Sequence, residues 1–416
     1  MRAGQGLPLL LLRGCDVDPL SANRVPYFER LARSSESAAR VGRLHTPHGV
    51  LETPAFFPVG TYAAVRGLAP EELEAAGVQG ILANTYHLHL RPGEELIARL
   101  GGLHSFMGWS RPILTDSGGF QLHSLDHLCR RSEEGVHFKS PIDGSERFLS
   151  PESCIEVQEA LGADLIVTLD EFEPIPTDPD PSADSRVRAL LERTLRWAQR
   201  GKVTQRRSDQ LLFGIVQGGG STALRGESAE RTRELGFHAF AIGGLGLGET
   251  PERRAQLLEA ALEPLPGDEP RYLMGLGTPR DLVESVARGV DLFDCVLPTR
   301  HGRHGAVFTH AGPLNLRNAR FRDDPDPVDA ECGCSVCARY SRAYLRHLMI
   351  SGEMLGPRLL TLHNLAYYMR LLAQARQAVE KDRFGDWAKE WRRSYSREEF
   401  SGERSGGSSA ATHSAA

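Results

Sequence analysis

The sequence contains no run of about 18 or more apolar residues, the length that a helix needs to cross a bilayer. It also has no excess of positive charge, because 49 Lys and Arg stand against 54 Asp and Glu and give a formal net charge of −5. The molecule as a whole therefore does not attract polyanions, and any nucleic-acid surface must be a local patch. The seven cysteines are an odd number for a disulfide framework. These absences predict a soluble protein of a reducing compartment, the cytoplasm.

The composition that remains is typical of a globular protein. Hydrophobic residues make up 40% and charged residues 25% of the 416 residues, which is enough for one large domain or two medium ones. The apolar stretch Leu7–Leu12 is too short for the core of a signal peptide. We expect residues 1–35 to be a weakly ordered extension and residues 401–416, which are small and polar, to be a disordered tail.

Eight short apolar runs end at Gly, Asp or Asn clusters, and most of them are followed by a helical pattern. Strands that alternate with helices pair in parallel through right-handed crossovers. Eight such strands predict an α/β fold, a closed (β/α)8 barrel, which we place at residues 36–315. The predicted strands are 55–59, 81–82, 113–114, 165–169, 212–216, 240–242, 272–274 and 292–296. The predicted helices are 70–76, 94–100, 151–160, 186–199, 222–235, 251–261 and 278–288.

Polar residues follow most of the predicted strands, at the end where a barrel of this type carries its site. Asp116, Asp170 and Asp294 stand at such strand ends, so we expect three carboxylates to converge on one mouth. Each also has a purely structural explanation, a helix N-cap for Asp116 and a salt bridge for the other two. Residues 135–149 alternate about Asp143-Gly144, which indicates an inserted β-hairpin able to lie over the mouth.

Three cysteines, Cys332, Cys334 and Cys337, are followed by His347 and His363. Three thiolates and one imidazole form a closed tetrahedral zinc set that leaves no position for water or substrate. The alternative is a disulfide among the cysteines, but a Cys-x-Cys bridge is strained and leaves one thiol over. We therefore predict a structural zinc ion that holds a C-terminal subdomain, residues 316–400, together. Spacing alone does not decide between the two histidines.

Residues 299–322 carry a local charge of +5 and contain no Asp or Glu, although the whole chain has a net charge of −5. Such an asymmetry points to phosphate. Arg300 and Arg303 directly follow the last predicted strand, so we expect them to rim the mouth that holds the aspartates. The alternative is an ordinary solvated face. The arginines of this segment are Arg300, Arg303, Arg317, Arg320 and Arg322.

Several strings, taken together with the Cys3His set, match a known family. They are Asn84-Thr-Tyr-His87 with Arg91-Pro-Gly93, Thr115-Asp-Ser-Gly-Gly-Phe-Gln121, Phe213-Gly-Ile-Val-Gln-Gly218, Gly243-Gly-Leu245, Tyr272-Leu-Met-Gly275 and Phe293-Asp-Cys-Val-Leu-Pro-Thr-Arg300. From about residue 50 to residue 395, the chain resembles the bacterial-type tRNA-guanine transglycosylases. This resemblance implies an irregular (β/α)8 TIM barrel with a zinc-binding insertion, as the residues themselves predict.

The resemblance implies a reaction in which the wobble guanine of tRNA is exchanged for a 7-deazaguanine in queuosine biosynthesis, with the phosphodiester backbone intact. Asp294 would be the nucleophile that attacks the anomeric carbon of the ribose, and Asp116 the general acid/base that handles the proton on the base. This chemistry suits carboxylates, because cleavage of an N-glycosidic bond builds positive charge on the sugar that a carboxylate can stabilise and then bond to.

The resemblance assigns the remaining contacts as well. The base would be bound by Ser117, Gly118, Gly119, Phe120, Asp170, Gln217, Gly244 and Leu245. A tRNA of the Asp, Asn, His or Tyr type would be bound by Gly275, Leu276, Gly277, Thr278, Pro279, Arg280, Asp281, Thr299, Arg300, His301, Gly302 and Arg303. The resemblance selects His363 over His347 as the fourth ligand of one structural Zn²⁺ per subunit, and it implies a catalytic homodimer.

Two other functions are compatible with parts of the sequence. His87-Leu-His89 follows a predicted strand, as in metal-dependent amidohydrolases, but later strand ends offer Gln217 and Gly243 where such enzymes need further histidines. A non-catalytic tRNA-binding subunit would have lost its catalytic carboxylates, whereas Asp116 and Asp294 are present here.

The chain departs from the bacterial pattern beside the expected base pocket. It has Phe172 where cysteine is usual and Leu247 where valine is usual. The resemblance implies that bacterial enzymes take 7-aminomethyl-7-deazaguanine, whereas eukaryotic ones take queuine and have a glycine at the position of Leu247. The bulk of Leu247 favours the smaller aminomethyl base. Salvage of queuine is the alternative.

Overall fold

The computed structural model describes residues 27–175 and 182–395. Parallel strands form the barrel in the order β4-β14-β13-β12-β11-β10-β6-β5. An isolated parallel bridge between Val59 and Leu82 links β4 to β5, which leaves the barrel nearly closed. The predicted α/β barrel is therefore confirmed. Its strands are β4 Ala55–Pro58, β5 Ile81–Ala83, β6 Ile113–Thr115, β10 Leu165–Val167, β11 Leu211–Val216, β12 Phe240–Ile242, β13 Arg271–Leu273 and β14 Leu292–Cys295.

Most of the longer helices around the barrel begin at a side chain that satisfies their free N–H groups. Ser150, Ser221, Thr250 and Thr278 each accept a hydrogen bond from the N–H three residues further on. The helices that surround the strands are α1 Pro70–Ala75, α2 Thr85–Leu90, α3 Glu94–Arg99, α4 Gly102–Met107, α5 Gly119–Ser124, α6 Pro151–Leu161, α7 Ala183–Thr204, α8 Thr222–Glu234, α9 Pro251–Leu262, α10 Pro279–Ala287 and α11 Leu297–His304.

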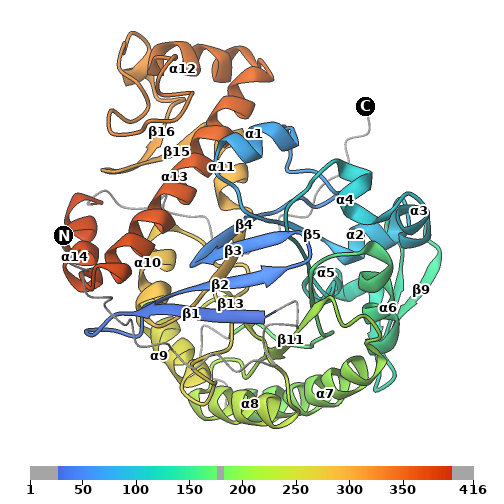
Figure 1. Cartoon of the computed structure of the whole chain (residues 1–416). Coiled ribbons are helices and arrows are strands. Elements are labelled where there is room, and N and C mark those ends of the chain that lie inside the picture. Colours follow the sequence, from blue (N-terminus) through green and yellow to red (C-terminus); the bar gives the residue numbers. More distant parts are fainter. Residues whose placement is uncertain (1–26, 176–181, 396–416) are drawn as a thin grey trace, which may run out of the picture.

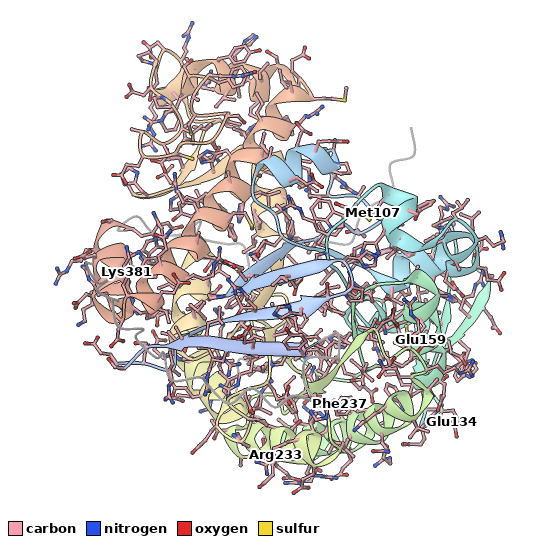
Figure 2. All side chains as sticks on the ribbon, in the orientation of Figure 1. Met107, Glu134, Glu159, Arg233, Phe237 and Lys381 are labelled. Carbon is pink, nitrogen blue, oxygen red and sulfur yellow. The ribbon has the colours of Figure 1, made fainter. Side chains whose placement is uncertain are left out.

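Helices α7, α8 and α9 form an arc along one side of the barrel (Figure 1). Figure 2 shows Arg233 on the outer surface of this arc, while Phe237 lies further inward. Phe237 is buried and packs against Gly214 of β11, where an added Cβ would meet its ring at 2.9 Å. The arc is thus attached to the strands by apolar contacts and presents charged groups to water. None of the helices that the structure describes is both long and apolar enough to cross a membrane.

Small antiparallel sheets flank the barrel. Strands β1 Tyr27–Arg33, β2 Arg40–Thr46 and β3 Gly49–Thr53 form the first, and they correct the predicted extension, because residues 27–33 lie in a strand. The rest of that extension, residues 1–26, and the predicted tail at residues 401–416 lie outside the described residues. β7 Cys129–Arg131, β8 Val136–Lys139 and β9 Glu146–Leu149 form the second sheet. It confirms the hairpin about Asp143 and adds a strand to it.

The C-terminal region is built around one long helix, α13 Leu355–Glu380. Its first turns carry Leu359 and Leu360, which pack in a small core with Val307, Leu316 and Val336. Its later turns enter the main core of the barrel, as Figure 1 shows beside β4 and α10. The predicted division between a barrel at 36–315 and a subdomain at 316–400 stays a prediction. The other elements of this region are β15 Ala306–Thr309, β16 Gly312–Asn315, α12 Arg342–Ser351 and α14 Phe384–Ser394, with short 3₁₀ turns at Asp126–Leu128 and Ala319–Phe321.

Candidate functional site

A cavity of about 370 Å³ opens at the carboxyl ends of the barrel strands. The three aspartates predicted to converge all line it, so that prediction is confirmed. No lining residue belongs to the sheet β7–β9, so the predicted hairpin does not form part of the cavity wall. The predicted base-binding and catalytic residues in the wall are Asp116, Ser117, Gly118, Gly119, Phe120, Asp170, Gln217, Gly244, Leu245 and Asp294.

Asp116 follows β6 and accepts hydrogen bonds from neutral groups. The donors are the N–H of Thr85 at 2.9 Å, the side-chain amide of Gln121 at 3.0 Å and that of Asn84. Burial raises the pKa of Asp116 above its ordinary value, and this effect is larger than the opposing effect of the hydrogen bonds. A carboxyl group with a raised pKa can hold a proton and return it near neutral pH, as a general acid/base must.

Asp170 follows β10 and is only 8% exposed. It accepts hydrogen bonds from Nε2 of Gln217 at 2.7 Å and from Oγ of Ser117 at 3.3 Å. Burial raises the pKa of Asp170 to about 6. The other amide atom of Gln217, Oε1, is buried and has no partner among the described residues. A buried acceptor without a hydrogen-bond donor raises the free energy of the folded state. Asp170 and Gln217 can therefore offer a carboxylate and an amide oxygen to a ligand with N–H groups.

Asp294 lies in β14 and is also 8% exposed. Its Oδ1 accepts hydrogen bonds from the hydroxyl of Tyr272 at 2.6 Å and from the N–H of Gly275 at 2.8 Å. No described residue donates to its Oδ2. Burial raises the pKa of Asp294 to about 6, with the charge of Asp116 acting in the same direction. One oxygen is thus held in place and the other is free to react.

Two glycines permit this arrangement. A Cβ at Gly119 would lie 2.6 Å from Oδ1 of Asp170, so a larger residue there would displace the carboxylate. Gly244 has a φ of +67°, a backbone conformation that L side chains rarely adopt. The loop that carries it is held from behind by Glu249, which accepts hydrogen bonds from the N–H groups of Gly246 and Leu247.

The walls of the cavity include both positions at which the sequence departs from the bacterial pattern, Phe172 and Leu247. The ring of Phe172 is nearly parallel to that of Phe120, at an interplanar angle of 10° and a centroid separation of 6.3 Å. His123 contacts the same ring, at a centroid distance of 4.6 Å. The rings of Phe120 and Phe172 and the Leu247 side chain thus all form part of the cavity wall.

Sequence reasoning assigned no role to several residues that shape this site. Asn84, Gln121 and Tyr272 donate hydrogen bonds to the aspartates. Each of them stands inside a string that matches the family, which is the signal that could have identified them. Glu249 lies outside those strings and is visible only in the structure.

Arg300 and Arg303 lie on α11. This helix begins directly after Val296, a residue of the cavity wall. Burial and the nearby charges of Arg66 and Arg300 lower the pKa of Arg303. No carboxylate of the described residues forms an ion pair with either arginine, so the cluster carries uncompensated positive charge. The sequence patch itself is divided, because Arg317 donates to the carbonyl of Met349 at 3.0 Å and therefore serves the fold.

Other residues that the resemblance assigned to tRNA binding make internal contacts. Gly275 lines the cavity, and Leu276, Thr299 and His301 are buried. Oγ1 of Thr278 accepts a hydrogen bond from the N–H of Asp281, at the start of α10. Gly302 packs against the backbone of Thr361 so closely that an added Cβ would clash with it. The carbonyl of Gly277 accepts a hydrogen bond from the hydroxyl of Tyr368. Pro279 opens α10 and is buried, and Arg280 donates to the carbonyl of Tyr395. Their contact with tRNA stays a prediction.

Cys332, Cys334, Cys337 and His363 bring their ligand atoms within 4.8 Å of one another. Nδ1 of His363 lies 3.3 Å from the Sγ atom of Cys337 and 3.6 Å from that of Cys334, and its Nε2 donates to the carbonyl of Phe308 at 2.8 Å. The separations between Nδ1 and the two sulfur atoms suit ligands of one tetrahedral ion. The hydrogen bond from Nε2 to Phe308 fixes the orientation of the ring, as is usual for a histidine that binds a metal. The competing His347 lies on α12, next to Ser351.

The amidohydrolase alternative needs a metal site at the mouth. The two groups of described residues that could hold a metal ion are the Cys3His set and His48 with His104 and Asp164, and neither includes His87 or His89. His89 instead pairs with Glu94 at 2.8 Å. His89 therefore has a structural explanation, whereas His87 lines the cavity but belongs to no group of described residues that could hold a metal ion.

The comparisons with known proteins agree with the geometry. The family model described as "Queuine tRNA-ribosyltransferase" matches residues 35–397. The chain is 51% identical to the queuine tRNA-ribosyltransferase of Halothermothrix orenii over 368 residues, which cover 88% of this chain and 97% of that protein. It is 48% identical to that of Zymomonas mobilis over 375 residues, which cover 89% and 96%. It is 52% identical to that of Herpetosiphon aurantiacus over 364 residues, which cover 88% and 92%.

Proposed function

The chain belongs to the queuine tRNA-ribosyltransferase family, and we propose on that basis that it inserts 7-aminomethyl-7-deazaguanine at the wobble position of tRNA. Membership makes it a tRNA-guanine transglycosylase, an enzyme that exchanges guanine in tRNA. The observation that carries the mechanism is the cavity itself, where three carboxylates with raised pKa values lie at one mouth and accept hydrogen bonds from neutral groups. Carboxylates held in this way are available for chemistry rather than for ion pairs.

Asp294 is the proposed nucleophile. Its free Oδ2 attacks C1′ of the ribose, the bond from C1′ to N9 of guanine breaks, and the electron pair of that bond leaves with the base. Tyr272 and the N–H of Gly275 hold Oδ1, so they orient the carboxylate without blocking the reacting oxygen. A second displacement by the incoming base releases Asp294, and two inversions retain the configuration at C1′.

Asp116 is the proposed acid/base. It donates a proton to the departing guanine and takes one from the incoming base, so that no charge accumulates over a full exchange. Asn84, Thr85 and Gln121 keep the carboxyl group at the cavity wall in both protonation states, because a neutral donor can serve a carboxylate and the unprotonated oxygen of the acid alike.

Asp170 and Gln217 are the proposed partners of the hydrogen-bonding edge of the base. Guanine and 7-deazaguanines present a ring N–H, an amino group and a carbonyl on that edge. The carboxylate of Asp170 accepts from the first two, and Oε1 of Gln217 supplies a further acceptor. Gly244 and Leu245 also line the cavity, where their N–H groups are proposed to donate to the carbonyl, and Ser117–Phe120 form a further part of the wall.

The choice of 7-aminomethyl-7-deazaguanine rests on Leu247 and Phe172, which both line the cavity. Queuine carries a cyclopentenediol on the same position of the ring system, and two large side chains leave little volume for it. The alternative is salvage of queuine, which would need compensating space elsewhere in the cavity. A non-catalytic role for the chain is disfavoured because Asp116 and Asp294 are both present at the mouth.

The Cys3His set is proposed to hold one Zn²⁺ per subunit, with a structural role because four protein ligands leave no open position. We expect one zinc per chain in a metal analysis and loss of the α12–α13 packing on chelation, seen as lost helical circular dichroism. More than one zinc per chain would favour a further metal site. A homodimer that binds one tRNA remains a proposal, and sedimentation of the free enzyme and its tRNA complex tests it.

The experiment that tests the function is incubation of the enzyme with unmodified tRNA of the Asp type and labelled guanine. We expect label in the tRNA and none in a control tRNA whose wobble base is not guanine. Excess unlabelled 7-aminomethyl-7-deazaguanine should chase the label out of the tRNA, because it competes with guanine for the same exchange. Absence of label in both tRNAs would contradict the proposal.

A further inference from the structure

Behind the base pocket lies an arginine that no part of the mechanism uses. Arg225 on α8 is fully buried, with 0% of its surface exposed. Its guanidinium donates to three backbone carbonyls, Nε to Gly219 at 3.0 Å, one terminal nitrogen to Gly243 at 2.6 Å and the other to Gly244 at 3.0 Å. Of the described carboxylates, none forms an ion pair with it. Burial lowers the pKa of Arg225 to about 10, so it stays charged at neutral pH.

A buried cation that no carboxylate contacts directly is expensive, even with the charge of Glu249 nearby, which makes its contacts informative. Gly219 belongs to the loop after β11, the loop that also carries Gln217. Gly243 and Gly244 belong to the loop after β12. The planar fork of an arginine can bridge several carbonyls that a single ammonium group cannot. Arg225 therefore joins the two loops that form one wall of the base pocket.

The direction of the peptide groups shows what this bridge does. In a trans peptide the C=O and the N–H point in opposite directions. Since Arg225 binds the carbonyls of Gly243 and Gly244, the N–H groups of Gly244 and Leu245 are turned away from the arginine. Both residues line the cavity, and neither N–H donates to an acceptor among the described residues.

We propose that Arg225 is a positioning residue that fixes the Gly244 and Leu245 N–H groups as donors to the carbonyl of the base. Its positive charge also polarises the two peptides, which strengthens those donors when negative charge builds on the departing or incoming base. This inference rests on the proposed function, because it assumes that a purine-like base occupies the cavity.

The chain offers a matched control at the other end of the barrel. Arg271 is also buried and also donates to two backbone carbonyls, those of Leu265 at 2.8 Å and Pro266 at 3.2 Å. Burial likewise lowers the pKa of Arg271 to about 10. It lies at the amino end of β13 and away from the cavity lining. Loss of either arginine removes buried hydrogen bonds, but only Arg225 touches the base-pocket loops.

The test compares KM for labelled guanine and KM for tRNA in Arg225→Met, Arg225→Lys and Arg271→Met. We expect Arg225→Met to raise KM for guanine by roughly ten- to a hundredfold, the loss typical of a misplaced hydrogen-bond donor pair, while KM for tRNA stays near the wild-type value. Arg225→Lys keeps the charge but bridges fewer carbonyls, so its KM for guanine should lie between those of the wild-type enzyme and Arg225→Met. Arg271→Met should lower the melting temperature and leave KM for guanine unchanged.

Two results would overturn the inference. One is a folded Arg225→Met with wild-type KM for guanine; the other is an equal rise in Arg271→Met, which would reduce the effect to general destabilisation. If Arg225→Met does not fold, Arg225→Lys decides by the same KM comparison. A wild-type enzyme that incorporates no guanine would instead contradict the proposed function itself, before any variant is compared.

Discussion

At the carboxyl end of the barrel, Asp170 and Asp294 accept hydrogen bonds from neutral groups, whereas at the amino end Asp164 and Asp291 are surrounded by histidine and arginine side chains. All four carboxylates are buried. The pKa of each mouth aspartate is raised to about 6 by burial. Burial acts on Asp164 in the same direction, but hydrogen bonds from His104, the N–H of Ile113 and His48 outweigh it, so its pKa lies below the ordinary value.

The amino-end acids attach the sheet β1–β3 to the barrel. Asp291 accepts two hydrogen bonds from the guanidinium of Arg40 on β2 and one from the N–H of Arg271. Asp164 accepts hydrogen bonds from both the ring and the N–H of His48, in the turn between β2 and β3. The contacts with Arg40 and His48 join segments far apart in the sequence. The acids at this end therefore hold the fold together.

The group of His48, His104 and Asp164 has the donor atoms of a metal site but the wrong orientation for one. The two imidazole rings are stacked, with centroids 3.4 Å apart and an interplanar angle of 14°. An ion bound by both rings would lie in both ring planes, and nearly parallel stacked planes do not meet at a bonding distance. Each ring instead lies within hydrogen-bonding distance of the carboxylate, His48 at 2.8 Å and His104 at 3.1 Å.

The difference between the two ends is a difference in what the folded state does for a carboxylate. At the amino end the protein supplies cations and N–H donors, which lowers the free energy of the charged form. At the mouth it supplies burial and neutral donors, which leaves the charged form reactive and the fold less stable than it would be otherwise.

The largest expected effect is on activity, at the mouth. Asp294→Asn should lower the rate of exchange by a factor on the order of 10⁴ or more, because the nucleophile is lost. It should leave tRNA binding intact, since the shape of the side chain is kept. Denaturing gels of enzyme with tRNA should show a covalent adduct for the parent and none for the variant. An adduct that persists would remove Asp294 from its proposed role.

The matching change at the amino end should act on stability instead. Asp164→Asn is expected to lower the free energy of unfolding by about 3–5 kcal/mol, because it breaks a buried charged network while leaving its partners in place. Urea unfolding measures the loss, and the rate of exchange per folded molecule should stay near that of the parent. Asp170→Asn is the control, and we expect it to be at least as stable as the parent at pH 7. Equal losses in the two variants would contradict the comparison.

The pH dependence of stability should differ in sign between the two ends. The folded pKa of Asp170 and of Asp294 is about 6, above the ordinary 3.8, so the folded state binds more protons between these values. The free energy of unfolding should therefore fall as the pH rises from about 4 to 6, by up to about 3 kcal/mol per group. Asp164 has a lowered folded pKa, so its contribution is present above pH 3.8 and is lost as the pH falls further.

Urea unfolding of Asp170→Asn and of the parent, at pH 4.5 and at pH 7, isolates one of these groups because the others cancel in the difference. The variant should lose less stability than the parent between the two pH values. The titration of Asp294 should appear in the exchange rate instead. This rate is expected to rise with pH through about 6, as Asp294 ionises. A parent and variant with identical pH dependence would show that the Asp170 pKa is ordinary.

Much of this architecture follows from local sequence. The buried strands of a parallel barrel are short apolar runs that end at polar residues, so β10, β11 and β12 were placed within about two residues, in the range expected for element boundaries. The three aspartates and the three cysteines are recognised from residue type and spacing, whereas the choice of His363 over His347 comes from the family resemblance. The short helices α2 and α5 are not predicted from the sequence, although the equally short α1 and α3 are. Helices α1 and α3 have acidic residues in their first turn, whereas α2 and α5 have none.

Contacts between distant segments were out of reach. The sheet β1–β3 is partly exposed and rich in charge, so its strands do not have the apolar pattern of the barrel. Arg225 shares its helix with Arg231 and Arg233, which form ion pairs or surface contacts. Nothing in that helix marks the first arginine as the one that turns inward, because α8 has no clear apolar face. Only the packed structure separates them.

A smaller effect is expected on specificity at the mouth. Leu247→Gly removes a side chain from the cavity wall, which should relieve a steric cost of about 1–3 kcal/mol and raise kcat/KM for queuine relative to 7-aminomethyl-7-deazaguanine. Competition assays with both bases measure the ratio. Phe172→Cys, on the aromatic side of the cavity, shows whether that wall matters as well. Comparable kcat/KM for the two bases in the unmodified enzyme would favour queuine salvage.

The smallest expected effect concerns the rim. Arg300 and Arg303 have no carboxylate partners among the described residues, in contrast to the arginine at the amino end that pairs with Asp291. If they bind phosphates, Arg300→Ala and Arg303→Ala should each reduce the slope of log Kd against log salt for tRNA by roughly 0.7 to 0.9. Arg206→Ala, an exposed arginine just before β11 and thus at the amino end, is the control and should leave the slope unchanged. Unchanged slopes in all three variants would show that Arg300 and Arg303 are ordinary solvent-exposed residues that do not contact phosphates. The phosphate contacts would then have to come from elsewhere on the surface.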